Sequence, residues 1–133
     1  MRGKLELMAQ KLGLSETVKF LGSISQNEVA EWMRKSKCLL LSSKSEGMPN
    51  VVVEALASGI PVVATDVGDV SAVIREGVNG RVVSANTDTT ADELAKALND
   101  VLGQKWDADV LRESVADFDW KHNAGTVVEI VGR

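Results

Sequence analysis

The amino-acid sequence predicts an α/β fold in which a doubly wound parallel sheet is covered by helices on both faces. Strand-like apolar runs alternate with helix-like runs along the 133 residues, and the segments between them are short. With no Tyr and only two Phe, the core must be built mainly from Leu, Val, Ile and Ala, as in buried parallel strands and their covering helices. Such alternation implies right-handed crossovers and a Rossmann-like sheet, whose ligands bind at the carboxyl ends of the strands.

The first part of the chain is expected to form a helix, a strand, a helix and a second strand. Apolar residues recur at helical spacing over residues 5–12, and a glycine follows. Residues 18–21 alternate in polarity and end at a glycine, which predicts a short strand. Residues 25–35 begin with the Ser-x-x-Glu spacing of a capping box, and 38–41 form an apolar run typical of a buried strand.

The alternation continues toward the C-terminus. Helices are expected over 49–58, 70–75 and 90–102, separated by strands over 61–65 and 81–83. Residues 107–131 form a tail with a helical pattern, and the whole chain, 1–133, is expected to be a single domain. Packing roles are expected for Trp32, Trp106 and Trp120, turn roles for Gly59 and Gly80, and a surface position for His122.

Charge and cysteine content exclude several classes of function. The 19 acidic and 15 basic residues are interleaved, so no basic stripe suits a nucleic acid. Cys38, the only cysteine, cannot form an intrachain disulfide and is interpreted as a small buried hydrophobe, which favours a reducing compartment. The absence of a long apolar run favours a cytoplasmic location.

The most promising ligand-binding segment is the polar stretch 42–50, which leaves one predicted strand and enters a predicted helix. Gly47 allows a ligand to approach the backbone closely. The amides near Asn50 and Val51 would lie at the amino terminus of the helix, where backbone N–H groups and the helix dipole favour an anion.

Two glutamates flank this helix start. Glu46 lies just before the helix and Glu54 about one turn inside it, so both carboxylates can face one crevice and accept hydrogen bonds from two sets of hydroxyls. The alternative interpretation is that both are solvated carboxylates at the surface of a helix terminus.

The pattern resembles the GT-B fold glycosyltransferases of group 1, typified by the retaining glycogen-synthase-like and sucrose-synthase-like enzymes. The shared signature is a strand ending in Ser43, then Glu46, a glycine, a small apolar residue, a proline, and a second glutamate at Glu54. The similarity covers about residues 3–102 and is most specific over 39–80, which includes the Gly-Val-Asn-Gly run at 77–80.

The resemblance implies the nucleotide-sugar-binding, C-terminal half of an enzyme that transfers a hexose, with retention, from a nucleoside-diphosphate sugar to a glycan or other hydroxyl acceptor. Glu46 would act at the catalytic centre by binding hydroxyls of the donor sugar, and Glu54 would hold the ribose hydroxyls. Gly22 and Ser23 would lie against the base. Backbone amides facing the sugar and the diphosphate are implied at Gly47, Met48, Asn50 and Val51. No cofactor or metal is implied.

The resemblance also implies missing parts, namely the first strands of this domain and an N-terminal acceptor domain. Uncovered sheet edges would then favour a homo-oligomer. A partner domain could place the chain at the inner membrane face. The alternative function is a folded, self-associating fragment with no catalytic activity of its own. A receiver-like signalling domain is disfavoured, because no acidic pair follows the first predicted strand.

Overall fold

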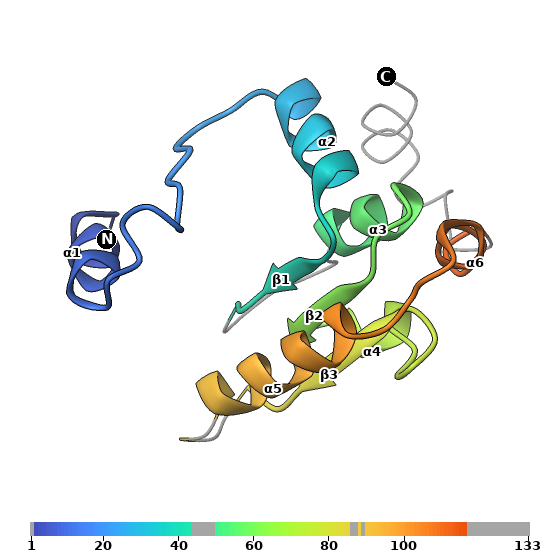
Figure 1. Cartoon of the computed structure of the whole chain (residues 1–133). Helices are drawn as coiled ribbons and strands as arrows, with labels where there is room; N and C mark the ends of the chain where they lie inside the picture. Colours follow the sequence, from blue (N-terminus) through green and yellow to red (C-terminus); the bar gives the residue numbers. More distant parts are fainter. Residues whose placement is uncertain (1, 44–49, 86–87, 89, 117–133) are drawn as a thin grey trace.

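The computed structural model contains a parallel three-stranded sheet with helices on both faces (Figure 1). The strands β1 (Leu39–Leu41), β2 (Val62–Thr65) and β3 (Gly80–Val83) lie in the order β1-β2-β3 and are all parallel. This confirms the predicted α/β fold with a parallel sheet. The structure describes residues 2–43, 50–85, 88 and 90–116.

The helices follow the predicted order, with small shifts at their ends. They are α1 (Arg2–Lys11), α2 (Gln26–Lys35), α3 (Asn50–Ala57), α4 (Val70–Val73), α5 (Thr90–Leu102) and α6 (Ala108–Glu113). The predicted capping box of α2 is confirmed, since Glu28 N donates to Ser25 Oγ (3.2 Å) and Ser25 N donates to Glu28 Oε2 (2.7 Å). The predicted tail begins with α6, and its part from residue 117 onward lies outside the described residues.

The core has two parts, one on each face of the sheet. Val62 and Ala64 of β2 belong to the larger cluster, which is formed chiefly by α3, α4 and α6. Val63 belongs to a smaller cluster with residues of α5. This division follows from the strand itself, since successive side chains point to opposite faces. Trp106 packs against both clusters, which confirms its predicted packing role.

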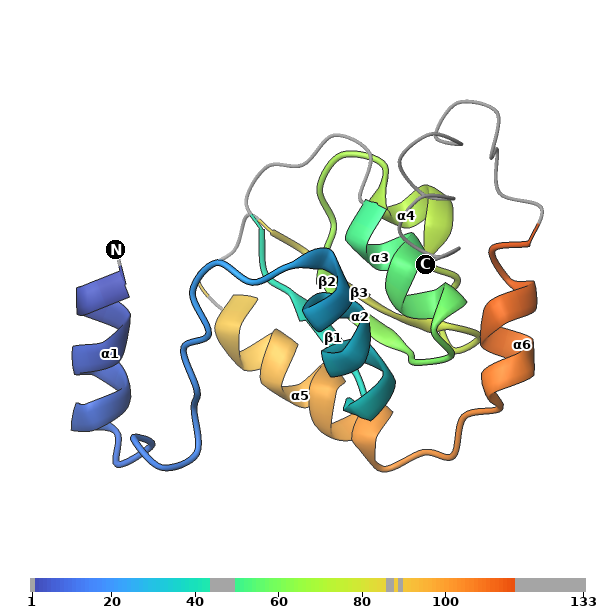
Figure 2. The same ribbon diagram turned by 90° about the horizontal axis from the view of Figure 1, so that it is seen from above.

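The strand predicted over residues 18–21 is wrong. These residues form part of an irregular segment between α1 and α2, and both Val18 and Leu21 are exposed. The alternating pattern is present, but a strand also needs a neighbour, and none of the described strands pairs with this segment. Helix α1 stands apart from the sheet and its covering helices in both views (Figures 1 and 2).

Three other local expectations meet different outcomes. Gly59 is confirmed as a turn glycine, with a φ of +86° directly after α3. Gly80 is not a turn residue: it begins β3, and a Cβ placed on it would lie 2.0 Å from the carbonyl oxygen of Val62. Trp32 is 43% exposed, so its predicted packing role is wrong for the described residues.

Two further features are the environment of Cys38 and the character of the described helices. Cys38 is half-buried, its Sγ donates to the Leu39 carbonyl at 3.3 Å, and burial raises the pKa of this thiol. No helix among the described residues combines the length and the apolar character needed to cross a bilayer.

Candidate functional site

The carboxyl ends of β1 and β2 are joined by a side-chain hydrogen bond. Thr65 Oγ1, at the end of β2, donates to the carbonyl oxygen of Ser43 at 2.5 Å, and Thr65 is only 2% exposed. The chain therefore leaves both strands at one edge of the sheet, the edge where parallel α/β sheets bind ligands. Glu46, Gly47 and Met48 follow Ser43 and lie outside the described residues.

Helix α3 places two of the predicted site residues at its start. Asn50 is its first residue and Val51 its second, and both are half-buried. The first amides of an α-helix have no acceptor within the helix. Among the described residues, the side-chain oxygen of Asn50 is also buried without a hydrogen-bond partner. A ligand at this helix start could supply the missing donor.

Glu54 lies one turn further along α3 and is the only buried charged residue in the described ranges. It is 8% exposed, and its neighbours Val53 and Ala55 are fully buried. Within the described residues its carboxylate makes no hydrogen bond or ion pair. Burial raises the pKa of the Glu54 carboxyl above its ordinary value. Burial that disfavours the charged form of a carboxyl costs stability, and carboxyls perturbed in this way cluster at functional sites.

None of the hydrogen bonds described for the segment of Gly22 and Ser23 connects it to α3. Arg2 Nη2 of α1 donates to the carbonyl oxygen of Phe20 at 3.2 Å, and a Cβ placed on Gly22 would lie 3.0 Å from Arg2 Nη1. The segment is therefore attached to α1 on one side and to the capping box of α2 on the other. Gly22 itself has a φ of +66°, a backbone conformation that favours glycine.

The Gly-Val-Asn-Gly run at residues 77–80 links three elements of the fold through Asn79. Asn79 is fully buried, its Oδ1 accepts from Arg75 N (2.7 Å), and its Nδ2 donates to Val73 O (3.2 Å) and Ser114 Oγ (3.0 Å). One side chain thus ties the end of α4 and the residue after α6 to the start of β3. The signal in the sequence was the turn-forming Asn between two glycines, which favours local backbone bonding.

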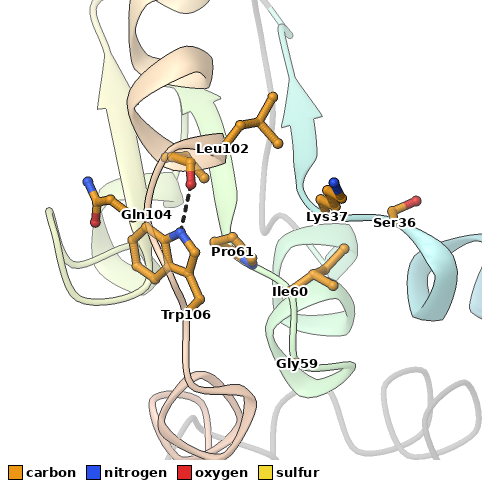
Figure 3. Close-up of a pocket in the computed structure, with 9 residues that line it drawn as sticks. Ser36, Lys37, Gly59, Ile60, Pro61, Leu102, Gln104 and Trp106 are labelled. Carbon is orange, nitrogen blue, oxygen red and sulfur yellow. Dashed lines mark hydrogen bonds between the residues drawn. The ribbon is translucent and has the colours of Figure 1, made fainter.

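A hollow of about 240 Å³ lies at the amino ends of β1 and β2, opposite the carboxyl ends (Figure 3). Lys37 and Pro61, which precede β1 and β2, line it together with Leu102 and Trp106. The indole Nε1 of Trp106 donates to the Val101 carbonyl at 2.8 Å, so its polar atom is already satisfied. This hollow is separate from the carboxyl edge, where the predicted site residues of α3 lie.

Residues 1–117 match the family model of the glycosyl transferases group 1, so the chain belongs to this family. A D-inositol 3-phosphate glycosyltransferase of Nocardia farcinica is 36% identical over 129 residues, which cover 92% of this chain and 27% of the relative. Its counterpart in Streptomyces coelicolor is 29% identical over 128 residues, covering 95% of this chain and 28% of the relative. The chain therefore spans little more than a quarter of the length of either relative.

Solved structures of glycosyltransferases share the fold. The sucrose-phosphate synthase of Thermosynechococcus elongatus superposes with a TM-score of 0.80 at 26% identity, over 97% of this chain and 33% of that one. WaaG, a glycosyltransferase involved in lipopolysaccharide biosynthesis, gives 0.76 at 26% identity, over 100% of this chain and 36% of that one. Anabaena HepE in complex with UDP superposes with a TM-score of 0.73 at 24% identity, over 98% of this chain and 36% of that one. The parallel sheet and its helices therefore have the arrangement found in GT-B glycosyltransferases.

Proposed function

We propose that this chain supplies the nucleotide-sugar-binding part of a retaining glycosyltransferase, which transfers a hexose from a nucleoside-diphosphate sugar to a glycan or other hydroxyl acceptor. The observation that carries the proposal is Glu54, the fifth residue of α3, which is only 8% exposed and whose carboxyl has a pKa raised by burial. An ionised carboxylate only accepts hydrogen bonds, and two adjacent ribose hydroxyls would offer it two donors.

The start of α3 suits the other end of the same ligand. The first amides of α3, around Asn50 and Val51, and the positive end of the helix dipole favour a diphosphate. The unpartnered amide oxygen of Asn50 could accept from a sugar hydroxyl. In this proposal Glu46, Gly47 and Met48 contact the donor sugar, and no metal takes part. No cluster of three potential metal-binding side chains occurs within the described stretches.

The family supports this assignment, because its members named above are glycosyltransferases and one structural neighbour holds UDP. A base contact from Gly22 and Ser23 would require the segment between α1 and α2 to approach α3. The acceptor would be bound by a further domain, which we propose as a partner of this chain.

One observation favours the alternative, a folded fragment without activity. Helix α1 and residues 18–21 have no place in the sheet or its covering layers, so the region proposed to meet the base is not assembled in this structure. Ligand binding by the purified chain separates the two functions.

The test is calorimetric titration with UDP, GDP, ADP and their glucose conjugates. Saturable binding by the parent chain is expected, and Glu54→Ala should weaken it about 10- to 100-fold, the worth of hydrogen bonds to a charged group. Glu113→Ala, at an exposed position of α6, is the matched control and should bind like the parent. No binding at millimolar ligand would leave the fragment alternative, and binding that survives Glu54→Ala would remove Glu54 from the site.

A further inference from the structure

The hydroxyl of Thr65 is a buried polar group at the end of an otherwise apolar strand. Val62, Val63 and Ala64 of β2 are fully buried, and Thr65 after them is 2% exposed. Valine has nearly the same shape as threonine and differs by a methyl group in place of the hydroxyl, so packing alone does not require threonine here. A buried hydroxyl without a hydrogen bond costs stability. The reason for threonine at this position therefore lies in the hydrogen bond that its hydroxyl makes.

This hydrogen bond reaches the chain where it leaves β1. Thr65 Oγ1 donates to the carbonyl oxygen of Ser43 at 2.5 Å, although the two residues are 22 positions apart in the sequence. The backbone pairing of β1 with β2 ends at the last residue of β1. Between β2 and β3 the backbone connection continues past the strands, because Asp66 N donates to Val83 O at 2.7 Å. On the β1 side, a side chain thus extends the connection beyond the last backbone pair.

The Thr65 hydroxyl is itself held in a fixed place. Strand β2 lies between β1 and β3, and all four of its residues are buried. A β-branched side chain has few allowed χ1 angles, so the backbone of the strand sets the direction of the hydroxyl. The carbonyl of Ser43 is therefore tied to the central strand of the sheet instead of to another surface segment.

Ser43 precedes the stretch to which the proposed sugar contacts belong. Glu46 follows Ser43 by three positions, and α3 begins at Asn50, seven positions after Ser43. In the proposed function, Glu46 and the two residues after it contact the donor sugar, whereas Glu54 and the start of α3 bind the nucleotide. Helix α3 is held by its own packing in the larger core cluster. The hydrogen bond of Thr65 acts on the other end of the stretch, which α3 does not hold.

We propose that Thr65 is a positioning residue for the sugar end of the donor, because its hydroxyl fixes the point at which the chain leaves β1 toward Glu46. This inference rests on the proposed function. At 2% exposure, Thr65 itself touches no ligand. Without its hydrogen bond the exit of β1 adopts more conformations, and the apparent dissociation constant rises by the factor by which the binding-competent fraction falls. The loss of one hydrogen bond corresponds to a change of about threefold to tenfold.

The first test compares a nucleotide with its sugar conjugate. UDP and UDP-glucose are titrated by calorimetry into the parent, Thr65→Val and Thr65→Ser, or GDP or ADP with its glucose conjugate where the parent prefers that pair. Thr65→Val should bind UDP-glucose about threefold to tenfold more weakly than the parent and should bind UDP like the parent. Thr65→Ser keeps the hydroxyl and should bind both ligands like the parent. A merely structural role would change the affinity for both ligands alike.

Ser36→Ala is the matched control for the loss of a hydroxyl group. Ser36 Oγ donates to Trp32 O at 2.6 Å, in the segment before β1 and away from the proposed site. This variant should bind both ligands like the parent, even where its urea midpoint falls as far as that of Thr65→Val. The inference is overturned if Thr65→Val changes the affinity for both ligands by one factor, or if Thr65→Ser behaves like Thr65→Val.

Hydrogen exchange without ligand tests the anchoring separately from the proposed function. Thr65→Val should exchange the amides of residues 39–43 faster than the parent and Thr65→Ser, while the amides of β3 stay unchanged. Equal exchange in Thr65→Val and the parent would overturn the positioning role. If the parent binds neither ligand at millimolar concentration, the proposed function fails and the sugar role of Thr65 fails with it. If both ligands bind and the ratio of their dissociation constants is the same in Thr65→Val, only this inference fails.

Discussion

Replacing Asn79 by Ala should destabilise the fold strongly, although the residue lies in a glycine-flanked turn. The side chain is fully buried and makes three hydrogen bonds, to Arg75 N, Val73 O and Ser114 Oγ. Each hydrogen bond contributes about 0.5–1.5 kcal/mol, and buried partners left unsatisfied add their own desolvation cost. The expected loss is about 3–5 kcal/mol, a large part of the roughly 5–15 kcal/mol that stabilises a domain.

Asn79→Asp discriminates hydrogen bonding from volume, because it keeps the shape of the side chain. An aspartate oxygen would face Val73 O, itself an acceptor, and a charge would be buried without a basic partner in the described region. This variant should therefore be at least as destabilised as Asn79→Ala. Asn99→Ala, at an exposed position of α5, is the control and should change the free energy of unfolding by less than about 0.5 kcal/mol.

The measurement is urea unfolding at one fixed protein concentration, followed by the fluorescence of the tryptophans. The midpoint should fall while the dependence on denaturant stays constant. If Asn79→Asp proved as stable as the parent chain, the hydrogen-bond reasoning would be refuted, since shape alone would then account for the burial of this residue.

Two further predictions concern a close backbone approach and a buried charge. Gly80→Ala should lower the free energy of unfolding by about 2–4 kcal/mol, because its Cβ would lie 2.0 Å from a carbonyl oxygen of β2. Gly77→Ala, with open space but a φ of +77°, should lower it by about 1 kcal/mol. Equal midpoints of urea unfolding for the two variants would contradict this reasoning. Burial raises the folded-state pKa of Glu54 above its ordinary value of 4.5, so protonation favours the fold and stability falls as pH rises through the folded pKa. Glu54→Gln should therefore melt higher than the parent at neutral pH, the difference vanishing below about pH 4.5 in thermal scans. An unchanged melting temperature at neutral pH would contradict a carboxyl whose pKa is raised by burial.

The parallel sheet was predictable because its signals are local. The apolar run at β2, the capping box of α2 and the apolar spacing of α5 can each be read within a dozen residues. Residues 18–21 carry an equally good local pattern, but a strand is a property of two segments, and the second is not visible in the pattern of the first. The turn role predicted for Gly80 was wrong for a related reason, since the position of this glycine depends on the carbonyl of Val62, 18 positions earlier.

The residues of the candidate site could be predicted from the sequence, but their burial and their contacts could not. The spacing around Glu54 indicated a carboxylate one turn inside a helix, which is where the structure places it. Its low exposure arises from α3 packing between the sheet and α6, which no local pattern encodes. Thr65 was missed as a site-forming residue because its partner, the carbonyl of Ser43, lies 22 positions earlier, in the segment after β1.

The segment between α1 and α2 decides how much of the proposed ligand site can form. Gly22 and Ser23, proposed to lie against the base, are attached to α1 through Arg2 and precede the capping box of α2. If this segment approaches α3 when a nucleotide binds, the base contributes to the affinity beside Glu54. If the segment binds no base, Glu54 with the start of α3 carries the affinity alone.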